Sequence, residues 1–451
     1  MHAAALSRRS GGALPARSAR TQPARAAHRL GLGRAHPGRR QALRVQPART
    51  RAQAAAPLRR GGADGGRLSA LAQTASATVR SVLLYLPQLK LGGAEISILR
   101  LAQGLQACGV AVALAVHRAD PAAQALAGDI ELLSLDAGRT LAVPRRLAQL
   151  LRQRRPDVLV SALTHSNIVA ALAARGTGVR TVLTEHAPIA SMRRLDRSRR
   201  YRATVALMPW AYRHADAIVA VSEGVREDIA AHLSQEQRRR LHVIANPVLP
   251  RDWRERADAP LAEDGYGGDG APTILSVGRL SEEKNFAGLI RAFARLRTPL
   301  RLHLAIVGEG PQRPALQALI DELGLGRVVR LLGQRDNPYP YMRRARVFAL
   351  ASQFEGFGNV LIEAMACGAP VVSTDCPVGP REVLAGGRYG LLVPPDDPGA
   401  LAEAIERQVR HADPQALAAA REHALQFTVE RSAGRYLRLF ERLMGDGAVR
   451  R

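Results

Sequence analysis

Short apolar runs alternate with longer amphipathic stretches from residue 81 onward. Seven runs come first, at 81–87, 110–117, 130–136, 157–164, 179–185, 217–221 and 241–246. Six more follow, at 273–277, 302–307, 328–332, 347–351, 370–373 and 391–393. Their apolar residues are continuous rather than alternating with polar ones, which is typical of strands covered on both faces. The pattern predicts an α/β protein with two parallel sheets whose strands are mostly joined by helices.

A polar, Gly- and Pro-rich stretch separates the two sets of strands. We expect a first Rossmann-like, doubly wound domain at 79–248, a linker at 249–271 and a second such domain at 272–426. An apolar stripe within 427–445 predicts a helix that packs back towards the first domain. Ligands of such sheets bind at the carboxyl ends of the strands. The functional loops of a cleft between the domains should therefore follow Leu86, Thr184, Val277, Val307 and Ser352.

The first 78 residues differ in amino-acid composition from the rest. They hold 15 arginines and one acid, Asp64, and so contribute +14 to the net charge of +26. Such a segment cannot bury enough apolar surface to offset its ordering entropy, and we predict that it is disordered. It could be an over-extended or functionless start, an organelle transit peptide, or an electrostatic arm for nucleic acid or membrane. The remaining +12 favours an anionic partner for the body of the chain.

Several classes of protein are disfavoured by what the sequence lacks. No apolar run approaches the ~18–20 residues of a membrane-spanning helix. Three cysteines, Cys108, Cys367 and Cys376, make neither a disulfide framework nor a zinc quartet, and we interpret them as buried or bystander residues. The dinucleotide fingerprint G-x-G-x-x-G does not follow the first strand, and the phosphate-binding P-loop motif G-x-x-x-x-G-K-[ST] occurs nowhere in the sequence.

Two of the predicted loops present groups that suit an anion. Gly92 and Gly93 open a helix and leave backbone N–H groups free for an anion or a sugar ring, although such a pair can also be only a tight turn. Arg279 and Lys284 bracket Ser281, a possible N-cap that would put Lys284 at the third helical position. A cation there opposes the helix dipole unless a diphosphate is bound. A solvated basic residue is the alternative.

The stretch from Phe354 to Pro370 carries two glutamates eight residues apart. Glu355 lies in a glycine-rich loop, and Glu363 lies about two turns into the apolar helix that follows. The amides of 356–359 form a second candidate site for an anion or a hydroxyl group. A buried Glu363 would need a partner, which the vicinal diol of a ribose could supply; the alternative is a solvated helix glutamate.

Five motifs, taken in order, resemble one enzyme family. The sequence is similar to family 4 of the retaining glycosyltransferases in G-G-A-E at Gly92, T-E-H-A-P at Thr184, V-G-R-L-S-E-E-K-N at Val277, E-(seven residues)-E at Glu355 and V-S-T-D-C-P at Val372. That family has the GT-B fold of two Rossmann domains. The resemblance covers residues of about 80–445. N-P-Y-P-Y-M at 337–342 and C-P-V-G-P-R-E at 376–382 resemble the subgroup that builds bacterial polysaccharide and lipopolysaccharide, often from UDP-linked hexoses or N-acetylhexosamines.

The resemblance implies a role for each matching residue. Arg279 and Lys284 would hold the donor diphosphate and stabilise the departing nucleotide, Glu363 would bind the ribose, and Glu355 would contact hydroxyls of the transferred sugar. His186 would lie beside that sugar, and Gly92 and Gly93 would approach the donor phosphates or the acceptor. The backbone amides expected to contact sugar and phosphate are those of Gly356, Phe357, Gly358, Asn359 and Val360.

The resemblance also implies a reaction. A hexosyl or N-acetylhexosaminyl group would pass from a nucleotide sugar to a saccharide or lipid-linked saccharide with retention of anomeric configuration. No D-x-D motif occurs, which fits a transferase without a metal or other cofactor, in which Arg and Lys replace a divalent cation. Two alternatives remain, a sugar-nucleotide epimerase on the same fold and a non-enzymatic nucleic-acid binder that acts through the tail.

An arginine cluster lies shortly after His186. Residues 193–202 hold six arginines and one aspartate. It is either a solvated loop or a patch for a lipid-pyrophosphate acceptor or an anionic membrane, with each charge near a membrane worth ~1 kcal/mol. The membrane interpretation rests on Arg193, Arg194, Arg199 and Arg200 and predicts a cytoplasmic protein attached to the inner face of the cytoplasmic membrane. His165 follows a predicted strand and is a candidate cleft residue, but we expect it to be a core or surface residue.

Overall fold

The computed structural model describes residues 78–89, 92–137, 142–261, 266–267, 270–298 and 300–448, with side chains up to 445. Apart from Thr78, the predicted disordered tail lies outside these residues. The first sheet has the order β3-β2-β1-β4-β5-β6-β7, and all its neighbouring strands are parallel. Its strands are β1 Ser81–Tyr85, β2 Ala111–Val116, β3 Glu131–Ser134, β4 Val158–Ala162, β5 Arg180–Glu185, β6 Ala217–Ala220 and β7 Leu241–Val243.

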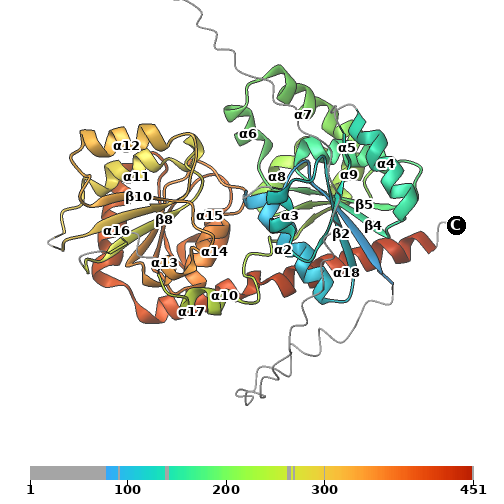
Figure 1. Cartoon of the computed structure of the whole chain (residues 1–451). Coiled ribbons are helices and arrows are strands. Elements are labelled where there is room, and N and C mark those ends of the chain that lie inside the picture. The colour runs from blue at the N-terminus through green and yellow to red at the C-terminus, as the bar shows by residue number, and fades with distance from the viewer. Residues whose placement is uncertain are drawn as a thin grey trace, which may run out of the picture. The chain divides into compact units, whose positions relative to one another are not determined.

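The second sheet repeats this arrangement with six parallel strands. Its order is β10-β9-β8-β11-β12-β13. The strands are β8 Thr273–Val277, β9 His303–Val307, β10 Val329–Gly333, β11 Val347–Leu350, β12 Val371–Thr374 and β13 Leu391–Val393. Two parallel, doubly wound sheets confirm the predicted fold class (Figure 1). Several strands are one to three residues shorter than their apolar runs, because the run continues into buried turn residues such as Leu86 and Val221.

Helices connect most of the strands and cover both faces of each sheet. Those of the first half are α2 Gly93–Ala107, α3 Pro121–Ala127, α4 Val143–Arg154, α5 Thr164–Ala174, α6 Ile189–Leu195, α7 Arg199–Tyr212, α8 Glu223–Ala230, α9 Gln235–Arg239 and α10 Trp253–Asp258. Those of the second half are α11 Phe286–Phe293, α12 Arg313–Glu322, α13 Tyr339–Arg344, α14 Asn359–Ala366, α15 Pro380–Val383, α16 Pro398–His411, α17 Pro414–Ala424 and α18 Val429–Ala448. Single 3₁₀ turns lie at Glu282–Lys284, Ala385–Gly387 and Leu425–Phe427.

The pleat of the strands divides the core of the first sheet in two. Val82 and Leu84 face one hydrophobic cluster, and Leu83 and Tyr85 face another, with all four at most 2% exposed. The first cluster also contains apolar residues of α2 and α18, and Figure 1 shows these two helices side by side. The second contains residues of α4, α5 and α7. Burial on both faces explains why the apolar runs are continuous.

The polar segment 249–271 contains a helix that its composition did not predict. Trp253 and Ala257, which lie one helical turn apart in α10, are 3% and 0% exposed. The helix packs against α13 of the second half, and Asn337 donates a side-chain hydrogen bond to the carbonyl of Arg256. Two apolar residues at this spacing therefore anchor a segment that has the composition of a linker.

The sheet topology determines where loops from different parts of the chain meet. Strand β1 pairs with both β2 and β4, and β8 pairs with both β9 and β11. The chain therefore leaves β1 and β4, and likewise β8 and β11, in opposite directions across the sheet. Such reversal points open crevices at the carboxyl ends of the strands. Gly92 follows β1, Arg279 and Lys284 follow β8, and Glu355 follows β11.

Candidate active site

Lys284 and Glu355 form an ion pair between the loops that follow β8 and β11. The distance from Lys284 Nζ to Glu355 Oε1 is 2.6 Å, and the side chains are 21% and 9% exposed. The hydroxyl of Ser352 donates to the same oxygen at 2.7 Å. Arg279 is exposed on the same loop as Lys284. Two cations and a carboxylate are thus gathered at the reversal point of the second sheet.

The helix start predicted around Lys284 is a single 3₁₀ turn, with Ser281 at its N-cap position and Lys284 as its third residue. Lys284 ends a 3₁₀ turn, the side chain of Ser281 caps nothing, and α11 begins only at Phe286. Asn285 is the actual N-cap: it adopts a left-handed conformation with φ of 48°, and its side chain accepts from Gly288 N at 3.1 Å. Asn tolerates this conformation better than most residues. Lys284 is therefore the residue before this N-cap, at the positive end of the helix dipole, where the Glu355 carboxylate offsets its charge.

The glycine-rich loop before α14 lies against the loop that carries His186. A Cβ atom built on Gly356 would lie 1.8 Å from the His186 carbonyl oxygen, so only glycine permits this approach. The hydroxyl of Ser222, at the N-cap of α8, donates to the Gly356 carbonyl at 2.9 Å. Gly358 caps α14 with φ of 91° and without a side-chain hydrogen bond. Phe357 is 3% exposed, and Val360 lies in the first turn of α14.

His186 follows β5 and has one ring nitrogen without a partner. Its Nε2 lies 3.0 Å from the Thr184 hydroxyl, whereas its buried Nδ1 has no hydrogen-bond partner among the described residues. Burial lowers the pKa of His186 to about 4. The ring is therefore neutral near pH 7, and Nδ1 can donate to or accept from a substrate hydroxyl, depending on the tautomer.

The buried His186 should make the stability of the fold depend on pH. The folded-state pKa of about 4 is lower than the unfolded value near 6.5. Between these values the unfolded chain binds a proton that the folded chain does not, so the free energy of unfolding falls as the pH falls from about 6.5 towards 4. Urea unfolding at pH 7.5 and pH 5.0 measures this loss, which we expect to be smaller in His186→Gln. Equal losses in both proteins would contradict the assignment.

The residue before His186 is a buried carboxyl group with three hydrogen-bond donors. Glu185 is 1% exposed and accepts from Thr164 Oγ1 and Asn167 Nδ2, both at 2.9 Å, and from the Tyr212 hydroxyl. Burial raises the pKa of Glu185. Asn167 also donates to the carbonyl of Thr184 at 2.9 Å. This network, which the sequence did not reveal, ties the end of β5 to α5 and α7.

Glu363 is buried, as its apolar surroundings suggested, but protein side chains already hold it. Arg100 of α2 lies 3.0 Å from Glu363 Oε1, and the Tyr339 hydroxyl donates to the same oxygen at 3.2 Å. The partner that a buried Glu363 was expected to need is therefore supplied, at one oxygen, by the protein itself. Tyr339 belongs to the N-P-Y-P-Y-M stretch, whereas nothing in the sequence marked Arg100.

The glycine pair lies at the start of α2, close to the start of α14. Gly92 is the extended N-cap of α2 and Gly93 its first residue. The Glu95 carboxylate folds back so closely that a Cβ on Gly92 would lie 2.3 Å from its Oε2. One turn further on, the Ser97 hydroxyl accepts from Asn359 Nδ2 at 3.2 Å. Asn359 also accepts from Asn246 Nδ2 at 3.0 Å, so the start of α14 contacts two segments of the first half.

The four arginines of the predicted membrane patch are not part of this cluster. Arg193 and Arg194 lie in the last turn of α6, and Arg199 and Arg200 begin α7. All four are exposed. The segment, for which a solvated loop was one alternative, is two helices separated by residues 196–198, because Ser198 caps α7 by accepting from Tyr201 N at 3.1 Å.

Family models match both halves of the chain. Residues 91–250 match the model described as Glycosyltransferase Family 4, and residues 271–411 match that described as Glycosyl transferases group 1. A relative from Campylobacter jejuni, N-acetylgalactosamine-N,N'-diacetylbacillosaminyl-diphospho-undecaprenol 4-alpha-N-acetylgalactosaminyltransferase, is 40% identical over 44% of this chain and 52% of its own length. The lipopolysaccharide core biosynthesis glycosyltransferase LpsE of Rhizobium meliloti is 33% identical over 51% of this chain and 65% of its own. The chain thus spans about half to two thirds of these relatives.

A solved structure has the same fold. Anabaena Alr3699/HepE in complex with UDP and glucose superimposes with a TM-score of 0.65 at 20% identity, over 80% of this chain and 99% of that protein. The two consecutive domain matches, the paired parallel sheets and this superposition agree. The chain therefore belongs to the GT-B glycosyltransferases, with a family 4 domain followed by a group 1 domain.

Proposed function

We propose that the protein transfers a hexosyl or N-acetylhexosaminyl group from a UDP-linked sugar to a saccharide or lipid-linked saccharide in cell-surface glycan synthesis. The observation that carries this proposal is the Lys284–Glu355 pair, which puts a cation and a carboxylate at the reversal point of the second sheet. The HepE structure is a complex with UDP and glucose, and the name of the Campylobacter relative describes a diphospho-undecaprenol-linked acceptor. Both support the proposal over the epimerase and the nucleic-acid binder.

In the proposed reaction the protein acts mainly through positioning and charge. Arg279 and Lys284 would bind the diphosphate and stabilise the negative charge that grows as the nucleotide departs. Glu355, His186 Nδ1 and the amides of 356–360 would orient the sugar. We expect retention of anomeric configuration and no requirement for a metal, because the two cations would perform the charge stabilisation that a divalent ion performs elsewhere.

A donor screen tests this function. The full chain is incubated with UDP-, GDP- and ADP-linked hexoses and N-acetylhexosamines, with and without saccharide acceptors, and released nucleotide is measured. We expect UDP release that acceptor stimulates, unchanged activity in EDTA, and a product whose anomeric proton coupling matches that of the donor. Release of a C-epimer without free nucleotide would instead identify an epimerase. Inversion at the anomeric carbon would contradict the retaining mechanism.

We further propose that the acceptor is reached at a membrane surface. None of the helices that the structure describes is long and apolar enough to cross a bilayer. The arginine patch, Arg193, Arg194, Arg199 and Arg200, lies on the helices that also carry the exposed apolar residues Leu195, Leu207 and Trp210, which are 43%, 43% and 39% exposed. Basic residues beside exposed leucine and tryptophan suit a surface that contacts anionic lipid.

Substitution of the patch tests the membrane proposal. Changing its four arginines to serine should reduce binding to anionic vesicles and activity on a lipid-linked acceptor, while hydrolysis of the donor hardly changes. Because the attraction is electrostatic, binding should also weaken as salt shortens the Debye length to about 10 Å at 0.1 M. Sedimentation with anionic and neutral vesicles is the measurement. Equal binding to both, or to neither, would favour a soluble acceptor.

A further inference from the structure

Arg100 joins the helix after the glycine pair to the second glutamate of the E-(seven residues)-E motif. Its Nη1 and Nη2 both lie 3.0 Å from Glu363 Oε1, and the two side chains are 13% and 10% exposed. Nη2 also lies 3.3 Å from the Tyr339 hydroxyl, and Nη1 donates to the carbonyl of Val248. The guanidinium group therefore bridges α2, the end of the first half, α13 and α14.

The contacts on Glu363 are uneven between its two oxygens. Both Arg100 nitrogens and the Tyr339 hydroxyl donate to Oε1, whereas no described residue donates to Oε2. A carboxylate can accept about four hydrogen bonds, two on each oxygen. One oxygen is thus fixed by the protein, and the other keeps its full capacity to accept from a ligand.

We propose that Arg100 is a positioning residue that fixes Glu363 through Oε1 and so presents Oε2 to the ribose hydroxyls of the nucleotide. This inference rests on the proposed function, because it assigns how that site recognises its donor. It also makes the nucleotide site depend on a helix of the first half, since α2 supplies the guanidinium group. A ribose hydroxyl bonded to a charged oxygen contributes about 1.5–3 kcal/mol, or a factor of roughly 10–100 in affinity.

The test compares two nucleotides in four proteins by calorimetry. UDP and 2′,3′-dideoxy-UDP differ only in the hydroxyl groups that Glu363 would bind. We expect the wild type to prefer UDP by at least tenfold, Arg100→Ala to bind both about equally, and Arg100→Lys to regain part of the preference. Arg251→Ala, which removes the exposed pair with Glu430, is the matched control and should keep the wild-type preference.

Loss of the buried pair could also unfold the chain, because removing one partner leaves an uncompensated buried charge. If Arg100→Ala does not fold, Arg100→Lys and Tyr339→Phe, which each remove a donor from Oε1, should both lower the preference for UDP. The inference would be overturned if folded Arg100→Ala preferred UDP over 2′,3′-dideoxy-UDP as strongly as the wild type does. The same result in both Arg100→Lys and Tyr339→Phe would also overturn it. A wild type that binds UDP without preferring it would also overturn it. A wild type that binds neither nucleotide would instead contradict the proposed function.

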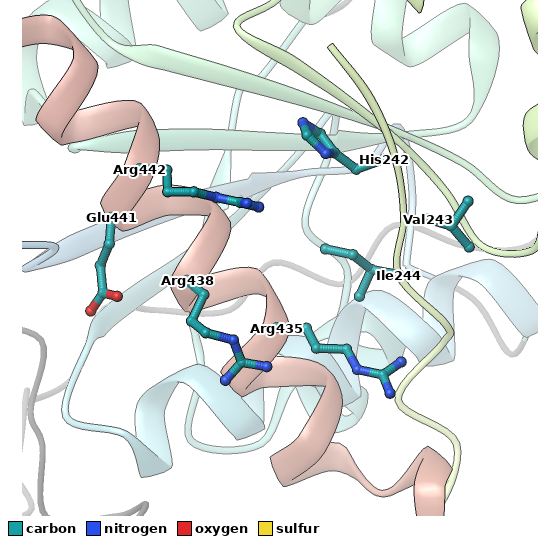
Figure 2. Close-up of a pocket in the computed structure, with 7 residues that line it drawn as sticks. All are labelled: His242, Val243, Ile244, Arg435, Arg438, Glu441 and Arg442. Atoms are coloured by element: carbon teal, nitrogen blue, oxygen red, sulfur yellow. The ribbon is translucent and has the colours of Figure 1, made fainter. Parts of the chain in front are cut away.

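A cavity of about 620 Å³ lies between the edge strand β7 and α18. It is lined by His242, Val243, Ile244, Arg435, Arg438, Glu441 and Arg442, and none of the site residues above takes part. Figure 2 shows Arg435 and Arg442 reaching from α18 towards β7. Burial, with a smaller effect of Arg442, lowers the pKa of His242, so the cations of this cavity near pH 7 are the three arginines.

These three arginines, which are all exposed along α18, resemble Arg291 and Arg407 in forming no ion pair with a described carboxylate. Five other helix-associated arginines pair with a carboxylate three or four residues away: Arg226, Arg240, Arg256, Arg313 and Arg410. Within the described residues, no carboxylate lies within 4 Å of the guanidinium nitrogens of Arg435, Arg438 or Arg442, although Glu441 lines the same cavity. Because α18 continues to Ala448, all three lie before its last turn, where the helix dipole does little to favour them.

The geometry points to a binding site for a phosphate group at this cavity, carried either by a free phosphorylated molecule or by a lipid headgroup. Guanidinium groups match phosphate oxygens in pairs, and three of them can neutralise a diphosphate. To silence the donor site, the test uses full-length chain with Arg279→Ala and Lys284→Ala as background. Inorganic pyrophosphate is titrated by calorimetry, and sedimentation is measured with vesicles of phosphatidylglycerol or phosphatidylcholine.

Changing Arg435, Arg438 and Arg442 to glutamine should abolish binding either of pyrophosphate or of phosphatidylglycerol vesicles. Loss of pyrophosphate binding would indicate a free ligand, and loss of phosphatidylglycerol binding alone would indicate a headgroup. The matched control changes three exposed arginines of the second half, Arg291, Arg330 and Arg407, to glutamine and removes the same net charge. If both triple variants behave alike in both assays, the cavity is not a phosphate site.

Discussion

Lys284→Ala is expected to lower turnover by about 100-fold, and Arg279→Ala by a similar factor. Both cations would act on charge that develops only as the nucleotide leaves, and loss of one such preorganised group typically lowers turnover by about 100- to 1000-fold. Lys284 has a second effect, because its removal leaves the carboxylate of Glu355 with Ser352 as its remaining hydrogen-bond partner among the described side chains. Lys284→Ala should therefore also weaken the orientation of the sugar.

We would measure turnover at saturating donor and, separately, the affinity for UDP. The comparison separates a loss of catalysis from a loss of nucleotide binding. Arg330→Ala, at an exposed position of β10 in the same half, is the matched control and should keep wild-type turnover. Melting temperatures show whether each variant folds. Near-normal turnover in folded Arg279→Ala/Lys284→Ala protein would disprove the diphosphate role.

Gly356→Ala should reduce activity about as strongly without removing any functional group. The added Cβ would meet the His186 carbonyl oxygen at 1.8 Å, so the loop before α14 or the loop after β5 has to move. A displacement of about 1 Å in a catalytic geometry can cost roughly 100-fold in rate. We expect the affinity for UDP to change less than turnover does, because Arg279 and Lys284 lie on a different loop.

Gly326→Ala provides the comparison for this backbone effect. Gly326 is exposed, and a Cβ there would meet nothing within 4 Å. Activity and nucleotide affinity of the two variants are measured side by side. If Gly356→Ala retains wild-type turnover, the close approach of the two loops has no part in catalysis.

The fold was largely predictable because both faces of both sheets are covered. Burial on two sides makes strands such as β1 and β8 continuous in apolar residues, so that each run marks one strand. Helix α10 escaped prediction because only Trp253 and Ala257 are buried, and two apolar residues do not make a visible period. Asn285 was not recognised as the N-cap of α11 because it caps the helix from a left-handed conformation, whereas Ser281 precedes only a 3₁₀ turn.

The candidate site likewise contains residues that could be predicted from the sequence and residues that could not. Residues that stand in loops after strands, such as Lys284 and Glu355, were predictable because chain position alone places them at one edge of a sheet. Arg100 was not, since its partner Glu363 lies 263 residues away and the pairing depends on how α2 and α14 approach each other. Glu185 escaped attention because its buried carboxyl group is held by neutral donors from two other helices.

Helix α18 completes the hydrophobic cluster on one face of the first sheet although it is the last helix of the described chain. Tyr436, Leu439 and Phe440 belong to the cluster that contains Val82 and Leu84, and Gly104 of α2 lets the helix approach so closely that a Cβ there would lie 2.8 Å from Ala433 Cβ. On the ribosome, the first half emerges long before this helix is made. One apolar face of its sheet therefore stays incomplete until α18 has been synthesised, so the order of synthesis and the order of folding differ.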